Sequence, residues 1–234
     1  ADVVGLDVMQ FVADTAYNKC IDDPHRDKYI IPDKVKQLID NGSLGQKSGA
    51  GFYKKIDKGV IHVLDFDCMS YRPINKKRFK AVTIAREQNT LEGKLKAITF
   101  CNDDAGKFLW AITSQTLIYC ANLLGEIADD IVNIDNAMCW GFGWSKGPFK
   151  MWDMLGFDKV LEKMESEKIS IPNWVTEMRA NGFHSFYKQE HGKYFYYDKN
   201  NKDYKQINLG DDRIHFAQFI KNDKTIKKDW SASF

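Results

Sequence analysis

Apolar residues recur at helical spacing along most of this chain, and their positions predict its elements. A first helix is expected over residues 2–18, with four apolar residues on one face: Val4, Val8, Phe11 and Val12. A second helix is expected to start at Ile31-Pro32, because proline suits the first turn of a helix, and to stop at Asn41-Gly42. The chain therefore opens with a short helical module.

The longest helical pattern is a stripe with an apolar or small residue every three or four positions: Leu109, Ile112, Thr116, Cys120, Leu123, Ile127, Ile131, Ile134 and Met138. Such a stripe predicts a face that points into a core. Gly125 is expected to divide it into two helices, because glycine is a poor helix former. Residues 81–100 and 149–164 also have helical patterns, as does a segment that starts at Ile171-Pro172 and stops at Asn181-Gly182.

Two regions have the composition of strands instead. Residues 52–54 and 60–64 are β-prone and are separated by Asp57-Lys58-Gly59, which predicts a hairpin. Aromatic runs at 186–187, 194–197 and 204–207 predict a small meander. The predicted fold is thus mainly α, with small β-hairpins.

An internal repeat links the two halves of the chain. The pattern D-x-x-G-x-D occurs at residues 2–7 and again at 153–158, and the Ile-Pro and Asn-Gly pairs of the two predicted short helices also recur. Phe52-Tyr53-Lys54 returns as Phe186-Tyr187-Lys188. We interpret this as two copies of one helical module, of which the first lacks the N-terminal part that the second has.

Composition narrows the classes of partner. The 34 basic and 32 acidic residues are well mixed and give a formal charge of +2, so no basic stripe for nucleic acid is expected. No apolar run reaches the roughly 20 residues that a membrane span needs. The five cysteines are an odd number without C-x-x-C spacing, which predicts neither a disulfide framework nor a zinc site and fits a reducing cytoplasm.

Glycines at 141, 143 and 147 form the pattern G-x-G-x-x-x-G, which differs by one residue from the dinucleotide fingerprint G-x-G-x-x-G. That fingerprint needs a strand before it and a helix that opens at its last glycine, whereas residues 126–138 have a helical pattern. The glycine-rich segment 42–51 lacks the spacing of a phosphate-binding loop. We therefore expect no cofactor-binding residue in this chain.

Other candidate groups have structural interpretations that we prefer. The five histidines are dispersed without metal-ligand spacing, so no metal is predicted. Asp153 and Asp158 could form an acid/base pair, but capping of helices is the favoured interpretation. Trp140, Trp144 and Trp152 could line an acyl pocket, although a place in the core or in an interface is favoured.

Two motifs carry a family resemblance. Residues 44–53, LGQKSGAGFY, resemble the L-G-[RQ]-K-[TS]-G-x-G-F-Y signature of the C-terminal helical domain of 3-hydroxyacyl-CoA dehydrogenases. Ile134-Asp135-Asn136-Ala137-Met138, followed by Gly147-Pro148-Phe149 and Asp153, resembles a second motif of the same domain. The tandem arrangement and residues 229–234 resemble the bifunctional type, in which an enoyl-CoA hydratase domain follows.

The resemblance implies a duplicated helical domain of the type found C-terminally in 6-phosphogluconate dehydrogenase. We expect a first module at 1–75, a second at 76–190, and a meander and linker toward a hydratase domain at 191–234. The parent enzyme would oxidise L-3-hydroxyacyl-CoA with NAD in fatty acid β-oxidation. Its nucleotide fingerprint and its catalytic His and Glu would lie in a Rossmann domain outside this chain, so this chain alone is expected to be inactive and not to bind NAD.

The resemblance also bears on individual residues. The resemblance places the family's catalytic Asn on the first helix of the first helical module, which is not in this sequence. Its counterpart in the second copy is Trp110, so no catalytic residue is predicted. Gln46 and Lys47 are the candidate substrate contacts, because a glycine-rich loop with a lysine can meet a CoA phosphate, although a plain turn is an open alternative. A homodimer is left open, as is a non-catalytic helical interaction module.

Overall fold

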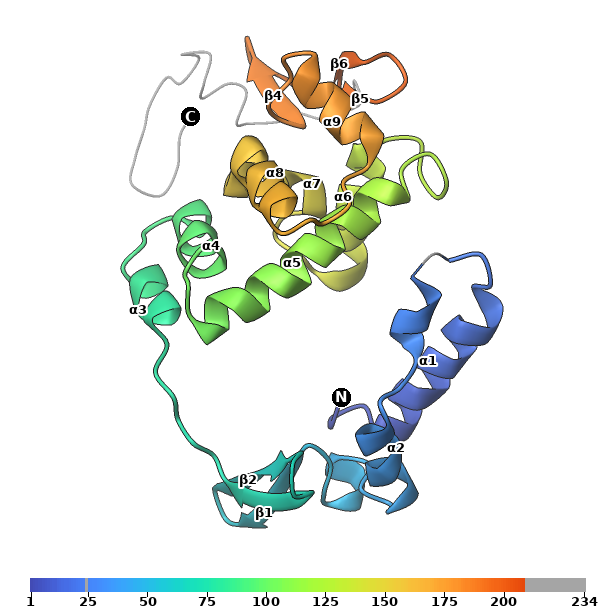
Figure 1. The fold of residues 1–234 in the computed structure, drawn as a ribbon, viewed down its shortest axis with the longest axis vertical. Coiled ribbons are helices and arrows are strands. Elements are labelled where there is room, and N and C mark those ends of the chain that lie inside the picture. The colour runs from blue at the N-terminus through green and yellow to red at the C-terminus, as the bar shows by residue number, and fades with distance from the viewer. Residues whose placement is uncertain (24, 209–234) are drawn as a thin grey trace, which may run out of the picture. The chain divides into compact units, whose positions relative to one another are not determined.

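The computed structural model describes residues 1–23 and 25–208, and it divides the chain into two units at Lys77 and Arg78 (Figure 1). Each unit has its own core and is described by itself. The predicted linker toward a hydratase domain falls on residues 209–234, outside the described residues. Among the described residues, no helix is long and apolar enough to cross a membrane.

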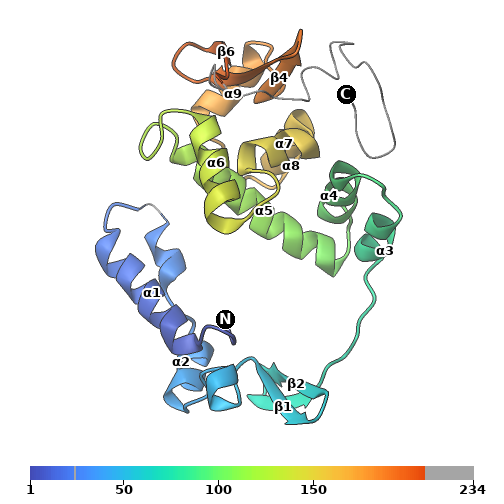
Figure 2. The same ribbon diagram turned by 180° about the vertical axis from the view of Figure 1, so that it is seen from behind.

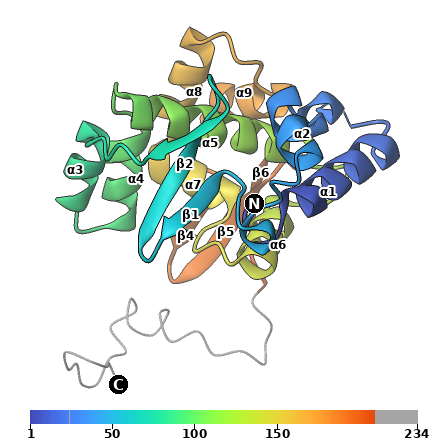
Figure 3. The same cartoon turned by 90° about the horizontal axis from the view of Figure 1, so that it is seen from below.

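The first unit combines two α-helices with a three-stranded antiparallel sheet of order β1-β2-β3. Its elements are α1 (Leu6–Lys19), η1 (Arg26–Tyr29), α2 (Asp33–Asp40), η2 (Gln46–Ser48), β1 (Tyr53–Asp57), β2 (Val60–Asp65) and β3 (Ser70–Pro73). The helices α1 and α2 lie side by side (Figure 3). Leu6, Leu38 and Leu64 form the small core beneath them. The predicted helices and hairpin are confirmed, and a third strand extends the hairpin.

The apolar face predicted for the first helix is present but does not enter this core. Phe11 and Val12 are 71% and 60% exposed, and Val4 and Val8 are exposed as well. Leu6 is instead the fully buried residue of α1. The face of α1 that packs on the core therefore contains Leu6 and not the predicted apolar residues.

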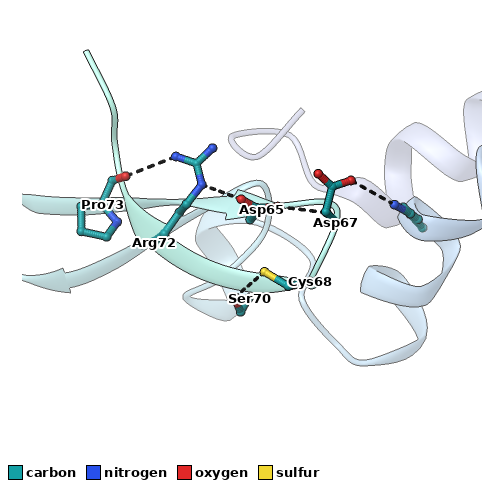
Figure 4. A network of polar contacts seen from close by, with 7 residues as sticks. Asp65, Asp67, Cys68, Ser70, Arg72 and Pro73 are labelled. Atoms are coloured by element: carbon teal, nitrogen blue, oxygen red, sulfur yellow. Dashed lines mark hydrogen bonds and ion pairs between the residues drawn. The ribbon is translucent and has the colours of Figure 1, made fainter. Parts of the chain in front are cut away.

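Polar contacts close the turn between β2 and β3 (Figure 4). Arg72 Nε donates to Asp65 Oδ2 at 2.7 Å, and the Asp67 backbone N–H donates to Asp65 Oδ1 at 3.0 Å. Cys68 Sγ lies 2.9 Å from Ser70 Oγ. Side chains of the turn and of the strand ends beside it therefore hold the turn in place.

The second unit is larger and mostly helical. Its elements are α3 (Lys80–Arg86), α4 (Leu91–Thr99), α5 (Asp104–Asn122), α6 (Ile131–Phe142), α7 (Pro148–Leu155), α8 (Phe157–Ser166), α9 (Asn173–Ala180), β4 (Tyr187–Glu190), β5 (Lys193–Asp198) and β6 (Asp203–Gln206). The strands form an antiparallel sheet of order β4-β5-β6, as predicted for the meander. The short helices α3 and α4 pack against each other next to the start of α5 (Figures 1 and 2).

An aromatic cluster lies at the centre of this unit. Phe186 precedes β4 and is fully buried, and its ring contacts Phe149, Trp152 and Phe157 at centroid distances of 5.0–5.2 Å. Gly156, at φ 99°, lets α7 turn sharply into α8, so that both helices present aromatic side chains to Phe186. The core is therefore built where the repeated motif D-x-x-G-x-D meets the repeated Phe-Tyr.

Two expectations for this unit need correction. Residues 81–100 form two helices, because the chain breaks at 87–90 and the Thr90 side chain caps α4 by accepting from Gly93 N–H. The predicted stripe is also interrupted: Ile112 and Ile127 are 50% and 65% exposed, and α5 buries Trp110, Ser114 and Leu117. Residues 123–130 form a turn between α5 and α6. The helical spacing of the predicted stripe is therefore broken there, and the apolar positions of α5 do not continue onto the same face of α6.

The duplication is visible in matched hydrogen bonds. The Leu64 N–H donates to Phe52 O at 2.8 Å, and the Tyr197 N–H donates to Phe186 O at 2.7 Å. Likewise the Tyr71 hydroxyl donates to Gly51 O, and the Tyr204 hydroxyl donates to Ser185 O. The repeat thus extends through all three strands of each sheet. The boundary expected at 190/191 falls in the turn between β4 and β5, which are paired with one another.

Candidate functional site

The first D-x-x-G-x-D pattern forms a carboxylate clamp, the name we use for an aspartate whose two oxygens accept adjacent backbone N–H groups. Asp2 accepts from the N–H of Phe52 at 2.9 Å and of Tyr53 at 2.8 Å. Gly45 and Gly51 flank it so closely that an added Cβ would lie 2.4 Å from Asp2 O and 2.6 Å from Asp2 Oδ1, respectively. The glycines of the signature therefore make room for Asp2.

The predicted substrate contacts Gln46 and Lys47 lie on the short helix η2 within this loop. Lys47 Nζ lies 2.7 Å from the Asp7 carboxylate, and this contact lowers the pKa of Asp7 below its ordinary value. The Gln46 N–H donates to Asp2 O at 2.8 Å, and the side chain is exposed. Both residues thus lie at the surface next to the clamp, and Lys47 already has an anionic partner.

The second unit repeats this arrangement with a shorter loop. Asp153 accepts from the N–H of Phe186 and Tyr187, both at 2.8 Å, and Asp158 lies 3.0 Å from His184 Nδ1. Our interpretation of Asp153 as a helix cap is wrong, because it lies near the end of α7 and holds the start of β4. Asp158 is in the first turn of α8, where a negative charge is favourable.

Asp135 forms a second buried carboxylate clamp in this unit. It is 1% exposed and accepts from the N–H of Phe149 at 2.8 Å, the N–H of Lys150 at 3.0 Å and the hydroxyl of Tyr187 at 3.0 Å. Burial raises the pKa of Asp135, although these hydrogen bonds oppose the rise. Gly147 packs directly on it, since an added Cβ would lie 2.4 Å from its side chain. The I-D-x-A-M and G-P-F segments are thus parts of one clamp.

Burial raises the pKa of Asp153 from 3.8 to about 7, against two backbone hydrogen bonds and with a further rise from nearby Asp135. Because folding raises this pKa, the contribution of Asp153 to stability is complete below about pH 4 and is lost as the pH rises through 7. We expect the second unit to lose about 2 kcal/mol of this contribution between pH 5 and 7.5.

Urea titrations of the chain and of Asp153→Asn at both pH values measure this loss by tryptophan fluorescence. Every tryptophan of the chain lies after residue 109, so the signal reports the second unit. The variant should be less stable at pH 5 but should show a smaller change with pH. An equal pH dependence in the two proteins would contradict the raised pKa.

The glycine corner cannot act as a dinucleotide fingerprint. Gly141 is inside α6, Gly143 ends that helix at φ 68°, and Gly147 precedes α7. The N–H groups of Phe149 and Lys150, which would face a phosphate, are already bound to the Asp135 carboxylate. Both sheets of the described residues are antiparallel, so neither supplies the parallel βαβ unit that the fingerprint needs.

Trp110 occupies the position that the resemblance assigns to a catalytic Asn. It is 5% exposed, and its Nε1–H donates to Glu167 Oε2 at 2.5 Å. The indole also packs beside Phe100, at a centroid distance of 6.0 Å, with Lys163 Nζ over its face at 5.0 Å. An indole that donates to a structural carboxylate ties α5 to the end of α8, which is a structural role.

Sequence reasoning found the repeated aspartates but not what they bind. The signal was the joint recurrence of D-x-x-G-x-D and Phe-Tyr, because each aspartate clamps its own Phe-Tyr pair. Sequence reasoning also missed a cavity of about 940 Å³ between α6 and the sheet β4-β5-β6. Of the described residues, no group of three or more His, Cys, Asp or Glu is arranged to hold a metal ion.

Comparisons with known proteins agree with the motifs. The family model described as "3-hydroxyacyl-CoA dehydrogenase, C-terminal domain" matches residues 1–55. A protein of Bacillus subtilis (strain 168), named a probable 3-hydroxyacyl-CoA dehydrogenase, is 41% identical over 232 residues, which is 99% of this chain and 29% of that protein. A protein of Rickettsia prowazekii (strain Madrid E), named a putative fatty acid oxidation complex trifunctional enzyme, is 25% identical over 74% of this chain and 24% of its own length. No solved structure matches.

The clamps and the duplicated helical fold define a class of domain, and the matches name the family that it resembles. The resemblance to 3-hydroxyacyl-CoA dehydrogenase C-terminal domains that the two motifs predicted is confirmed, because the family model matches residues 1–55 and the Bacillus subtilis relative aligns with 99% of the chain. It spans less than a third of the length of the curated relatives it matches. The activity of the whole protein is therefore a matter for proposal.

Proposed function

We propose that this chain is the helical part of an NAD-dependent L-3-hydroxyacyl-CoA dehydrogenase of fatty acid β-oxidation. The parent enzyme would oxidise the 3-hydroxyl group of the acyl chain to a ketone and pass the hydride to NAD. The observation that carries the proposal is the 41% identity to the Bacillus subtilis relative over nearly the whole chain. NAD would be held by a Rossmann domain outside residues 1–234.

Each unit has a definite part in this proposal. The first unit supplies the substrate side, because it contains the residues that match the family model. Gln46 and Lys47 are its proposed acyl-CoA contacts, since both are at the surface of the glycine-rich loop. A phosphate would have to compete with Asp7 for Lys47. The second unit acts as a structural copy, because Trp110 replaces the Asn and is committed to Glu167.

The finer features of the parent are also part of the proposal. A following enoyl-CoA hydratase domain is supported by the similarity to relatives named trifunctional enzymes, at 25% and 23% identity. We place the parent in the cytoplasm because the five cysteines of this chain are free. A homodimer remains open, and neither nucleic acid nor a membrane is proposed as a partner.

Calorimetry with NAD tests whether NAD binds outside residues 1–234. This chain alone should show no binding and no dehydrogenase activity, whereas the longer protein that contains it should bind NAD. Tight binding of NAD by residues 1–234 would contradict the proposal. If the longer protein also failed to bind NAD, the alternative class, a non-catalytic helical interaction module, would be favoured.

A further inference from the structure

The cavity between α6 and the sheet β4-β5-β6 has no role in the proposed dehydrogenase reaction. Its volume of about 940 Å³ is in the range of small-molecule sites. One wall is the outer face of α6, another is the turn that leads into α7, and the third is the sheet. All of its lining belongs to the second unit, so the cavity does not depend on how the two units are arranged.

Two lysines of this cavity carry positive charges without a direct ion pair, and one of them, Lys150, has its Nζ 5.1 Å from the centroid of the Tyr187 ring. Lys146 and Lys150 both line the cavity, and neither has a carboxylate within ion-pair distance among the described residues. The other lining lysines are paired, Lys188 with Glu190 at 3.1 Å and Lys205 with Asp198 at 3.9 Å. The Lys205–Asp198 pair repeats the Arg72–Asp65 pair of the first unit and so belongs to the sheet.

One lining carboxylate, Asp130, offsets part of the charge of the two lysines. Asp130 Oδ1 accepts from the N–H of Asn133 at 2.8 Å, and Oδ2 accepts from the side-chain amide of the same residue at 3.2 Å. It therefore serves as the cap of α6. Asp130 keeps its negative charge as a cap, and Lys150 also interacts electrostatically with the buried Asp135. Lys146 and Lys150 outnumber the one lining carboxylate that has no ion-pair partner, which leaves a local excess of positive charge that suits an anion.

A planar group is accommodated at the rim. Trp140 lines the cavity and is 80% exposed, so that its indole is available for stacking. Asn136 lies one turn before it on α6, and its side-chain amide makes no hydrogen bond among the described residues. An aromatic face, an amide that can both donate and accept, and two lysines are the groups that recognise a base and its phosphate.

We propose that this cavity binds a nucleoside that carries a terminal phosphate. Such a phosphate monoester has about −1.5 to −2 charges at neutral pH, which matches two unpaired lysines. The proposal does not rest on the dehydrogenase role. NAD is not a ligand of this class, because both its phosphates lie inside a pyrophosphate bridge and neither is a terminal monoester. The residues of the cavity come from α6, the turn into α7, the first turn of α7 and the sheet.

Calorimetry of the full chain with AMP tests the proposal, with inorganic phosphate, adenosine and NAD as comparison ligands. We expect AMP to bind more tightly than phosphate or adenosine, and NAD not to bind. Lys146→Glu and Lys150→Glu should each weaken AMP binding about tenfold or more, because each removes a charge-assisted contact. Trp140→Ala should weaken AMP binding about tenfold but leave phosphate binding unchanged.

The matched control is Lys94→Glu, which makes the same charge change at an exposed lysine of α4. Lys94 does not line this cavity, and it forms no ion pair with the residues that the structure describes. It should leave AMP binding unchanged. Absence of AMP binding to the unmodified chain at millimolar concentration would overturn the proposal, as would equal weakening by Lys94→Glu. Unchanged AMP binding in Trp140→Ala would overturn the assignment of the base.

Discussion

Ile131→Asp is expected to prevent the second unit from folding. Ile131 is the first residue of α6 and is 0% exposed, packed in the cluster that includes Ile134, Phe149 and Trp152. An aspartate there would bury an unpaired charge, at a cost of roughly several kcal/mol, and would also remove the apolar packing that the isoleucine provides. That cost is comparable with the whole stability of a small domain. Tryptophan fluorescence and far-UV circular dichroism should report an unfolded or aggregated second unit.

The matched control is Ile127→Asp, on the same predicted apolar stripe. Ile127 is 65% exposed in the turn before α6, so an aspartate there stays hydrated. We expect its free energy of unfolding, measured by urea titration, to change by no more than about 0.5 kcal/mol. Equal destabilisation by both substitutions would show that the described packing of α6 is wrong.

Asp135→Ala should destabilise the second unit by about 2–4 kcal/mol. The substitution leaves the N–H groups of Phe149 and Lys150 without their acceptor, and the hydroxyl of Tyr187 keeps only its longer contact with Ile131 O at 3.4 Å. Each unsatisfied buried donor costs about 1–3 kcal/mol, and relief of the burial of the Asp135 carboxylate offsets part of the total. The free energy of unfolding from urea titration, followed by tryptophan fluorescence, measures the result.

Asp129→Ala is the control for this prediction. Asp129 is exposed, in the turn that precedes α6, and we expect its removal to change the free energy of unfolding by less than about 0.5 kcal/mol. If Asp135→Ala proved as stable as the unmodified chain, the hydrogen bonds of the clamp would not stabilise the second unit, and the prediction would be wrong.

The sequence was sufficient for the helical class and for the duplication, because both are local signals. Proline at the start and Asn-Gly at the end located α2 and α9 to within one or two residues. The pairing of Asp153 with Phe186 and Tyr187 could not be derived in the same way. It joins residues 33 and 34 positions apart in sequence, and nothing in periodicity specifies which backbone N–H groups a carboxylate will reach.

Two further features depend on three-dimensional context in a similar way. Val8 and Phe11 have the spacing of a core-facing stripe, yet they are exposed in α1, because hydrophobic spacing shows that a face exists and not what covers it. The cavity at α6 brings Asn136 and Trp140 near Lys146 and Lys150. Those residues became candidates only when the turn into α7 and the sheet β4-β5-β6 were placed around them.

The initial rate of NADH formation by the longer protein that contains this chain tests the central claim most directly. With NAD and L-3-hydroxybutyryl-CoA we expect turnover that depends on both substrates. The D isomer should be oxidised far more slowly, and residues 1–234 alone should give no NADH. Absence of NADH formation by a folded longer protein that binds NAD would contradict the assignment to 3-hydroxyacyl-CoA dehydrogenation.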